Sequence, residues 1–212
     1  MTLRRFGNAL RRMVMSALNH SRTPRWAAAW EVLSRETGAE IIPPTFLSGG
    51  RFRLPHNGFV AELTTWASGE GNGTRIESEV LNSSGFDFLV RPRGRFEGLR
   101  SLIGGQPFLS GDQVFDKAFD VTGSSEADLT RVMTQSQLRE AVFQVGDCRI
   151  AFSEKPVHES FRLTRPAGSG IFLLVTETQD AINNVDRLRN LLNLHTRFLD
   201  ILVDIGVAEP AG

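Results

Sequence analysis

The residue types and motifs that are rare or absent in the 212-residue chain limit the reactions it could catalyse. Tyrosine is absent, lysine occurs only as Lys117 and Lys155, and Cys148 is the single cysteine. One cysteine cannot form an intrachain disulfide, which is compatible with a reducing cytoplasm. Neither lysine follows a glycine, so no Walker-type phosphate loop occurs, and there is no G-x-S-x-G nucleophile elbow. The sequence therefore carries no recognisable catalytic signature.

Long apolar runs and an excess of charge of one sign are also missing. No run approaches the roughly eighteen apolar residues of a membrane span, and the early run 13–15 is too short for a secretory signal. The formal net charge is zero, so nucleic acid is not expected as a partner. A chain that is 41% hydrophobic and 23% charged is typical of globular proteins. We expect it to be cytoplasmic, with a peripheral position on the inner face of the membrane left open.

Neither a metal nor a cofactor is expected. No histidine has a second histidine at i+4 or a cysteine at ligand spacing; the four are His20, His56, His158 and His195. Asp112, Asp116 and Asp120 recur every four residues, and clustered carboxylates can bind magnesium. A strand expected over 117–122 would prevent the three from sharing one face. His195 lies on the apolar seam of a helix and is interpreted as a hydrogen-bonded core residue.

Residues 3–18 are predicted to form an amphipathic helix with one apolar arc. Four arginines lie on its other side: Arg4, Arg5, Arg11 and Arg12. Three interpretations stay open, namely a helix packed on its own domain or on a sister subunit, a membrane-surface anchor, and an organellar transit peptide. These arginines are accordingly the candidate contacts to an anionic membrane or to an acidic partner.

A second helix is predicted between Thr23 and Gly38. Thr23 suits the N-cap, Pro24 the first helical position and Gly38 the C-terminal stop. Trp26 and Trp30 are one turn apart on this helix. We interpret the two tryptophans as core residues, because each can bury a large apolar area.

The next part of the chain is predicted to be antiparallel sheet. Its expected strands are 51–54, 59–66, 75–80 and 86–90. Asn57-Gly58, between the first two, is the dipeptide most typical of a tight hairpin. The last two strands are expected to pair with each other.

A basic stretch, 91–95, follows these strands. It reads Arg-Pro-Arg-Gly-Arg and has phenylalanines on both sides in the sequence. Basic residues beside aromatics can hold single-stranded nucleic acid. We interpret the stretch instead as a solvated strand end and turn, with Phe86, Phe88 and Phe96 inside the core.

The stretch 111–145 has the clearest local punctuation. Phe119 and Val121 alternate with polar residues, as in a strand, and Gly123 breaks the run. Ser124 or Ser125 is then expected to cap a short helix.

A second short helix is predicted directly afterwards. Thr134 and Gln137 form an S/T-x-x-E/Q capping box, which places its start at Thr134. Gly146 is expected to end it. Its apolar face consists of Leu138, Ala141 and Val142, and we expect Phe119 to be buried against that face.

A longer pattern runs through residues 86–205. It consists of F-x3-F-x-V, a helix of the form LT…L…L, two strands and a long terminal helix. The residues that carry it are Phe115, Phe119, Val121, Leu129, Thr134, Leu138 and Val142, with Phe96, Glu97 and Gly98 upstream. The pattern resembles a bacterial family known only as a domain of unknown function. The resemblance implies frequent membrane association and implies no catalytic residues.

The C-terminal part is predicted to contain three strands and the longest helix. The strands are 148–152, 158–164 and 171–176, the last being central and buried on both faces. The helix, 179–205, carries two neighbouring apolar stripes, which together are wider than one sheet contact requires. We therefore expect it to contact the sheet and also either helix 3–18 or a second subunit. In the second case the terminal helices would form a homo-oligomer.

These patterns predict an α+β protein with a largely antiparallel sheet of six to eight strands. Helices should cover the sheet, with a helical pair at the N-terminus and a long helix at the C-terminus. Residues 1–40 are expected to be an N-terminal helical extension and 41–212 the α+β domain. We expect a non-enzymatic bacterial binding or assembly module of unknown ligand. The alternative is a peripheral membrane protein that docks through residues 3–18, and an enzyme is the third hypothesis.

Overall fold

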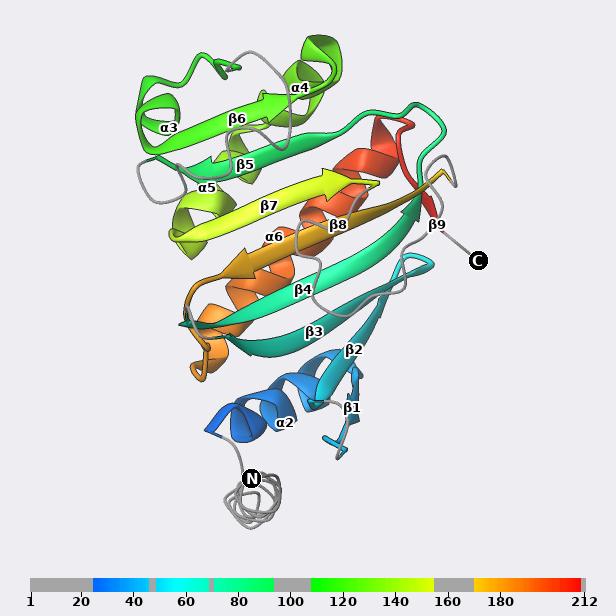
Figure 1. Cartoon of the computed structure of the whole chain (residues 1–212), viewed down its shortest axis with the longest axis vertical. Helices are drawn as coiled ribbons and strands as arrows, with labels where there is room; N and C mark the ends of the chain where they lie inside the picture. Colours follow the sequence, from blue (N-terminus) through cyan, green and yellow to red (C-terminus); the bar gives the residue numbers. More distant parts are fainter. Residues whose placement is uncertain (1–24, 46–48, 69–70, 94–107, 155–169, 211–212) are drawn as a thin grey trace, which may run out of the picture.

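The computed structural model describes residues 25–45, 49–68, 71–93, 108–154 and 170–210. Within them lies one antiparallel sheet of nine strands in the order β1-β2-β3-β4-β8-β7-β5-β6, with β9 paired to β4 (Figure 1). The strands are β1 (Glu40–Ile42), β2 (Arg51–His56), β3 (Phe59–Ser68), β4 (Gly71–Leu81), β5 (Phe88–Pro92), β6 (Phe119–Gly123), β7 (Cys148–Ser153), β8 (Ile171–Thr178) and β9 (Glu209–Pro210). The helices are α2 (Arg25–Thr37), α3 (Gln113–Ala118), α4 (Glu126–Met133), α5 (Ser136–Val145) and α6 (Val185–Asp204).

The α+β class is confirmed, with nine strands where six to eight were predicted. The predicted helix 3–18 and the predicted strand 158–164 lie outside the described residues. In Figure 1, α5 and α6 lie behind the sheet, and α2 adjoins it at the β1 and β2 end.

The predicted hairpin at Asn57-Gly58 is confirmed. His56 pairs with Phe59, so the two residues between them form the whole turn. Both have positive φ, 48° for Asn57 and 86° for Gly58, as a tight hairpin turn with matching twist requires. Gly58 also lies so close to Pro210 that an added Cβ would come within 3.0 Å of its ring.

The predicted pairing of 75–80 with 86–90 is wrong. β4 pairs with β3 and β8, whereas β5 pairs with β6 and β7. Asn82 organises the loop between them: its Oδ1 accepts hydrogen bonds from Ser84 and Gly85, and its Nδ2 donates to the Phe86 carbonyl. This loop carries the chain past two sheet positions, which β8 and β7 later fill. As predicted, β8 is a central strand and is buried on both faces.

The wide apolar surface of α6 is explained by the elements that it contacts. It begins at Val185, later than predicted, because the Asn184 side chain caps it. One side of the helix contacts β8, and α5 and α2 contact it as well. Arg189 of α6 also forms a two-oxygen ion pair with Glu36 of α2, at 2.9 and 3.0 Å. The surface that suggested a second subunit is thus covered within one chain, and oligomerisation through the terminal helices stays a prediction.

α2 packs on the sheet through its tryptophans. Trp30 is fully buried, and its ring centroid lies 6.1 Å from that of Phe52 in β2. Gly38 ends the helix as predicted, with a φ of 72° and an N–H bonded to the Ser34 carbonyl. The division of the chain at residue 40 stays a prediction, and its described N-terminal part contributes to the common core.

The stretch 111–145 contains one more helix than predicted. α3 occupies 113–118, so the strand begins only at Phe119. Ser125 caps α4 as predicted, accepting a hydrogen bond from the Asp128 N–H. The predicted capping box is wrong. Thr134 is instead the C-cap of α4, directly after Met133, with its hydroxyl bonded to the Thr130 carbonyl, so it is not available to cap α5.

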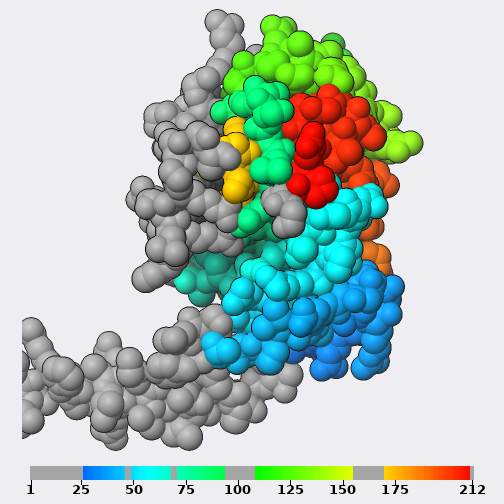
Figure 2. Space-filling view, turned by 90° about the vertical axis from the view of Figure 1, so that its right-hand side faces the viewer, coloured from blue at the N-terminus to red at the C-terminus, as the bar shows by residue number. Residues whose placement is uncertain are grey.

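The C-terminal segment closes the sheet at the hairpin end. β9 pairs with the last residues of β4, next to the β2–β3 turn. Figure 2 shows this segment in red against the cyan surface of the hairpin region. The hairpin and α6 are also joined by side chains, because Asp200 Oδ1 lies 2.7 Å from His56 Nε2 and accepts from Asn57 Nδ2 at 2.9 Å.

Phe119 is buried, as predicted, and its ring is part of an aromatic cluster, whereas its contact with Leu138 and Val142 stays a prediction. Its ring lies 5.0 Å from that of Phe115 and 5.4 Å from that of Phe143 in α5, centroid to centroid. We expect Phe119→Ala to lower the free energy of unfolding by about 3–5 kcal/mol, since it removes a buried ring and leaves a cavity. Val114→Ala, at a residue with 68% exposure, should change it by less than about 0.5 kcal/mol. Urea unfolding checks both, and a loss below about 1 kcal/mol for Phe119→Ala would contradict this packing.

Candidate functional site

The sheet face opposite α6 carries a row of charged side chains. Strand alternation places Cys148, Ile150 and Phe152 of β7 towards the helices and Arg149 on the other face. Cross-strand pairing continues this position from β6 to β2, and the pair Val90↔Ile150 sets Arg91 beside Arg149. We call the result the charged row: Asp120, Arg91, Arg149, Glu177, Arg75, Thr64 and Arg51. It crosses seven strands with four guanidinium groups and two carboxylates.

Glu177 in β8 is the centre of the row and is shared by two arginines. Its Oε1 accepts from Arg149 Nη1 at 3.0 Å. Its Oε2 accepts from Arg75, from Nη2 at 2.8 Å and from Nε at 3.0 Å. Arg149 and Glu177 are both buried. Two guanidiniums therefore converge on one carboxylate in a region shielded from water.

Arg149 has hydrogen-bonding capacity left over. The residue is 3% exposed, and its Nε is buried without a hydrogen-bond partner. Burial lowers the pKa of the Arg149 guanidinium, Glu177 raises it, and the neighbouring Arg75 and Arg91 lower it further. A guanidinium stays charged at neutral pH in proteins. The centre of the row therefore combines buried positive charge with an unused N–H group.

The row comes to the surface at its β6 end. Arg91 is buried and lies 3.8 Å from Asp120, while Arg93 Nε lies 3.0 Å from the other oxygen of that carboxylate. The prediction that 91–95 is a solvated strand end is wrong for Arg91, because β5 continues through it as an interior strand. Arg93, at 47% side-chain exposure, is accessible.

The row also surfaces at its β2 end. Arg51 lies 3.6 Å from one carboxylate oxygen of Glu62, and Arg53 lies 3.0 Å from the other. Their side chains are 39% and 45% exposed, respectively. Arg51, Arg53 and Arg93 thus form the accessible rim of a face whose centre is buried.

A serine and a histidine meet in the core, where they resemble a nucleophile and its base. His195 Nε2 lies 2.9 Å from Ser78 Oγ, and its Nδ1 lies 3.0 Å from Thr176 Oγ1. Ser78 donates its hydroxyl proton to the Val60 carbonyl, so it accepts from Nε2 and is not deprotonated by it. All three side chains are buried between α6 and the sheet. The arrangement holds His195 as the hydrogen-bonded core residue that was predicted.

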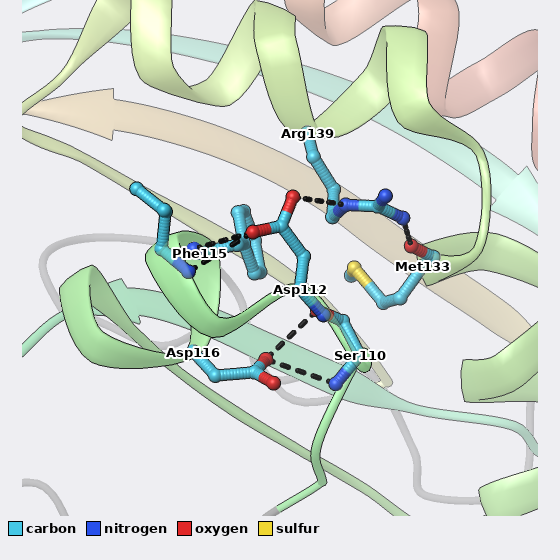
Figure 3. Close-up of polar contacts among 7 residues, drawn as sticks. Ser110, Asp112, Phe115, Asp116, Met133 and Arg139 are labelled. Carbon is cyan, nitrogen blue, oxygen red and sulfur yellow. Dashed lines mark hydrogen bonds and ion pairs between the residues drawn. The ribbon is translucent and has the colours of Figure 1, made fainter.

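The aspartates that recur every four residues do not form one site. Figure 3 shows two of them, Asp112 and Asp116, each with its own partners. Asp112 caps α3 through the Val114 and Phe115 N–H groups and accepts from Arg139 Nε at 3.3 Å. The Phe115 bond contributes most to lowering the pKa of Asp112. Asp116 accepts from the backbone N–H and the hydroxyl of Ser110, at 2.9 and 2.8 Å. These bonds, and the place of Asp120 in the charged row, give each carboxylate a separate structural role.

The remaining sequence candidates are placed as follows. Cys148 is buried, and burial raises the pKa of its thiol to about 12, so the reactive thiolate is not formed near neutral pH. Among the described residues, no three His, Cys, Asp or Glu side chains gather as a metal site would need. None of the helices in the described ranges has the length and hydrophobicity needed to cross a bilayer. Arg4, Arg5, Arg11 and Arg12 lie outside those ranges, as do His20 and His158.

No sequence motif marks the centre of the charged row. Arg149 and Glu177 each stand in a strand of apolar residues, outside any recognisable pattern. A usable signal was present, since a charged residue flanked by apolar ones in a doubly buried strand must find a partner. The partner itself depends on which strands are neighbours, and the wrong pairing of β4 with β5 concealed it.

Comparison of the chain with protein-family models, with curated proteins and with solved structures found no match. The candidate site therefore rests on its own geometry.

Because Arg75 and Arg149 share Glu177, neutralising this carboxylate should strongly lower the free energy of unfolding. Glu177→Gln keeps the shape but leaves two guanidiniums without their carboxylate, one of them buried. We expect the free energy of unfolding to fall by about 3–5 kcal/mol in urea titrations. The control Glu31→Gln removes an exposed ion pair with Arg35 and should change it by less than about 1 kcal/mol. Equal effects of the two substitutions would refute the central role of Glu177.

His195 predicts a pH dependence of stability. Burial, with a smaller effect of His56, lowers the pKa of His195 from 6.5 to about 3. Between these two values the unfolded chain binds a proton that the folded chain does not, so stability falls as the pH falls. From about pH 7 to about pH 5 the loss should be about 2 kcal/mol.

The matched variant for this effect is His195→Gln, which replaces the imidazole with an amide that can still form hydrogen bonds but cannot titrate. Urea unfolding of both proteins at the two pH values isolates the contribution of His195, because the other titrating groups are common to both. An identical pH dependence in the two proteins would show that His195 does not titrate in this window.

Proposed function

We propose that the protein is a non-enzymatic bacterial binding module that holds an acidic protein partner through the charged row. The observation that carries this proposal is the convergence of two guanidinium groups on one carboxylate at the centre of the row, where Arg75 and Arg149 share Glu177. The rim arginines at the two ends of the face are accessible, and the centre keeps an N–H group without an acceptor. Both features suit a partner that brings carboxylates.

The chemistry of the row favours recognition over bond making. A guanidinium donates up to five hydrogen bonds in a fixed plane and stays protonated near neutral pH. It is therefore suited to bind carboxylates and unsuited to act as a general base. The carboxylates of the row are already engaged with arginines, Glu177 with Arg75 and Arg149, and Asp120 with Arg93.

The distribution of charge favours a protein partner over nucleic acid. Glu62, Glu177 and Asp120 are interspersed with the arginines of this face. A continuous phosphate backbone would be repelled at each of these carboxylates, whereas a protein surface can place opposite charges against both signs. Exposed rim charges of this kind chiefly increase the association rate and the specificity.

The second candidate function is docking to an anionic membrane through residues 3–18. The observation that favours it lies in the sequence, where Arg4, Arg5, Arg11 and Arg12 share one side of a predicted amphipathic helix. This candidate uses a different part of the chain from the charged row, so one set of binding measurements can separate the two.

The test uses the full chain and a fluorescein-labelled oligoglutamate peptide, with binding followed by fluorescence anisotropy at low salt. We expect saturable binding that weakens with salt. Arg51→Gln with Arg53→Gln should raise Kd by about threefold to tenfold, because two accessible contacts are lost. Arg35→Gln with Arg131→Gln removes the same charge from exposed arginines of α2 and α4 and should leave Kd nearly unchanged.

Two outcomes would contradict the proposal. Equal weakening by both double variants would mean that net charge, and not the charged row, attracts the peptide. Absence of peptide binding together with sedimentation on phosphatidylserine vesicles would favour the membrane candidate instead, and that sedimentation should then disappear when residues 1–20 are deleted.

A further inference from the structure

The least satisfied group on the charged row is the side chain of Arg149. Of its three guanidinium nitrogens, Nη1 donates to Glu177 Oε1 at 3.0 Å, and the structure gives the side chain no other hydrogen bond among the described residues. Nε is buried without a partner in a residue that is 3% exposed. Buried N–H groups without an acceptor are rare in folded proteins because they give up their bonds to water and gain none.

The unused nitrogens form one edge of the guanidinium plane. Nε–H and the N–H of Nη2 point in the same direction, and this edge is the one that binds two oxygens of a carboxylate or phosphate side by side. Glu177 cannot fill it, because its Oε1 is bound to Nη1 on the other edge and its Oε2 accepts both bonds from Arg75. The missing acceptor must come from another group.

The surroundings of this edge favour a negatively charged acceptor. The positive charges of the neighbouring Arg75 and Arg91 both lower the pKa of the Arg149 guanidinium. Among the members of the charged row, only Glu177 forms an ion pair with Arg149. A neutral carbonyl would satisfy the N–H group, but an anion would also offset the mutual repulsion of the three arginines.

We propose that the free edge of Arg149 is the seat of an anion that presents two oxygens, a carboxylate or a phosphate group. This inference deepens the proposed function and rests on it, since the anion would be the group by which the partner is anchored at the buried centre of the row. The exposed rim arginines attract the partner, and the Arg149 edge fixes its position. Free phosphate offers the same two-oxygen chemistry and is the other source of such an anion.

The test observes the Arg149 Nε–H directly by ¹H–¹⁵N NMR of the full chain. Its resonance, assigned through the bonds of its own side chain, is followed during titration with sodium acetate, sodium phosphate or sodium chloride at constant pH and ionic strength. We expect a saturable downfield shift with acetate or phosphate and none with chloride. A shift with acetate alone identifies carboxylate as the ligand, and a shift with phosphate alone identifies phosphate.

Thermal unfolding supplies the second measurement. The binding anion should raise the Tm of the wild-type protein by about 5 °C at roughly 100 times its Kd, compared with chloride. Arg149→Lys keeps the charge and removes the two-nitrogen edge, so it should abolish this rise. Arg131→Lys, on the exposed surface of α4, should leave it intact.

Two results would overturn the inference: an Nε–H resonance that responds to all three salts alike, or an undiminished rise in Tm in Arg149→Lys. If Arg149→Lys does not fold, the wild-type NMR titration alone decides. Failure of the proposed function can be told apart from failure of this inference. If the protein binds acetate at Arg149 but does not bind oligoglutamate, the anion site stands and the acidic partner is rejected. If it binds oligoglutamate without a response at Arg149, only the anion site is rejected.

Discussion

The register between β7 and β8 is the constraint on which the rest of the structure depends. Cys148 pairs with Thr178 and Ile150 with Thr176, so apolar side chains of both strands face the helices while Arg149 and Glu177 meet on the opposite face. Because side chains alternate along a strand, a slip by one residue would place this ion pair under α6 and expose the core residues. The two strands also fill the gap between β4 and β5, so the same register aligns the outer halves of the sheet with each other.

Buried charge on this face is better understood as a means of fixing the register than as a source of stability. Desolvation of Arg149 and Glu177 offsets much of their attraction, and well-packed apolar residues of the same size are often no less stabilising. Apolar pairs, however, tolerate a shifted strand, whereas a carboxylate shared by Arg75 and Arg149 does not. The helix face has a corresponding polar contact, since Ser78 and Thr176 engage both ring nitrogens of His195 and align α6 with the sheet.

Features specified by neighbouring residues were predictable from the sequence, and features specified by distant ones were not. The turn at Asn57-Gly58, the stop at Gly38 and the cap at Ser125 were confirmed because each depends on the conformation or the hydrogen bonds of a few adjacent residues. The capping box at Thr134 failed because a competing local bond, from the Thr134 hydroxyl to the Thr130 carbonyl, makes this residue the C-cap of the preceding helix. The strand order and the charged row depend on contacts between residues far apart in the chain, and sequence periodicity contains no information about which strands become neighbours.

The strand order also determines when this chain can fold. β8 pairs with β4 across about a hundred residues of sequence, and His56 in the first hairpin meets Asp200 with a separation of 144 positions. During synthesis, the hairpins of the first half emerge from the ribosome well before the strand and the helix that cover them. Until then their apolar faces are exposed, so they can bind chaperones or associate with other nascent chains. The protein is therefore expected to complete its fold late in translation, in one step in which β8 and α6 dock on the strands that were synthesised before them.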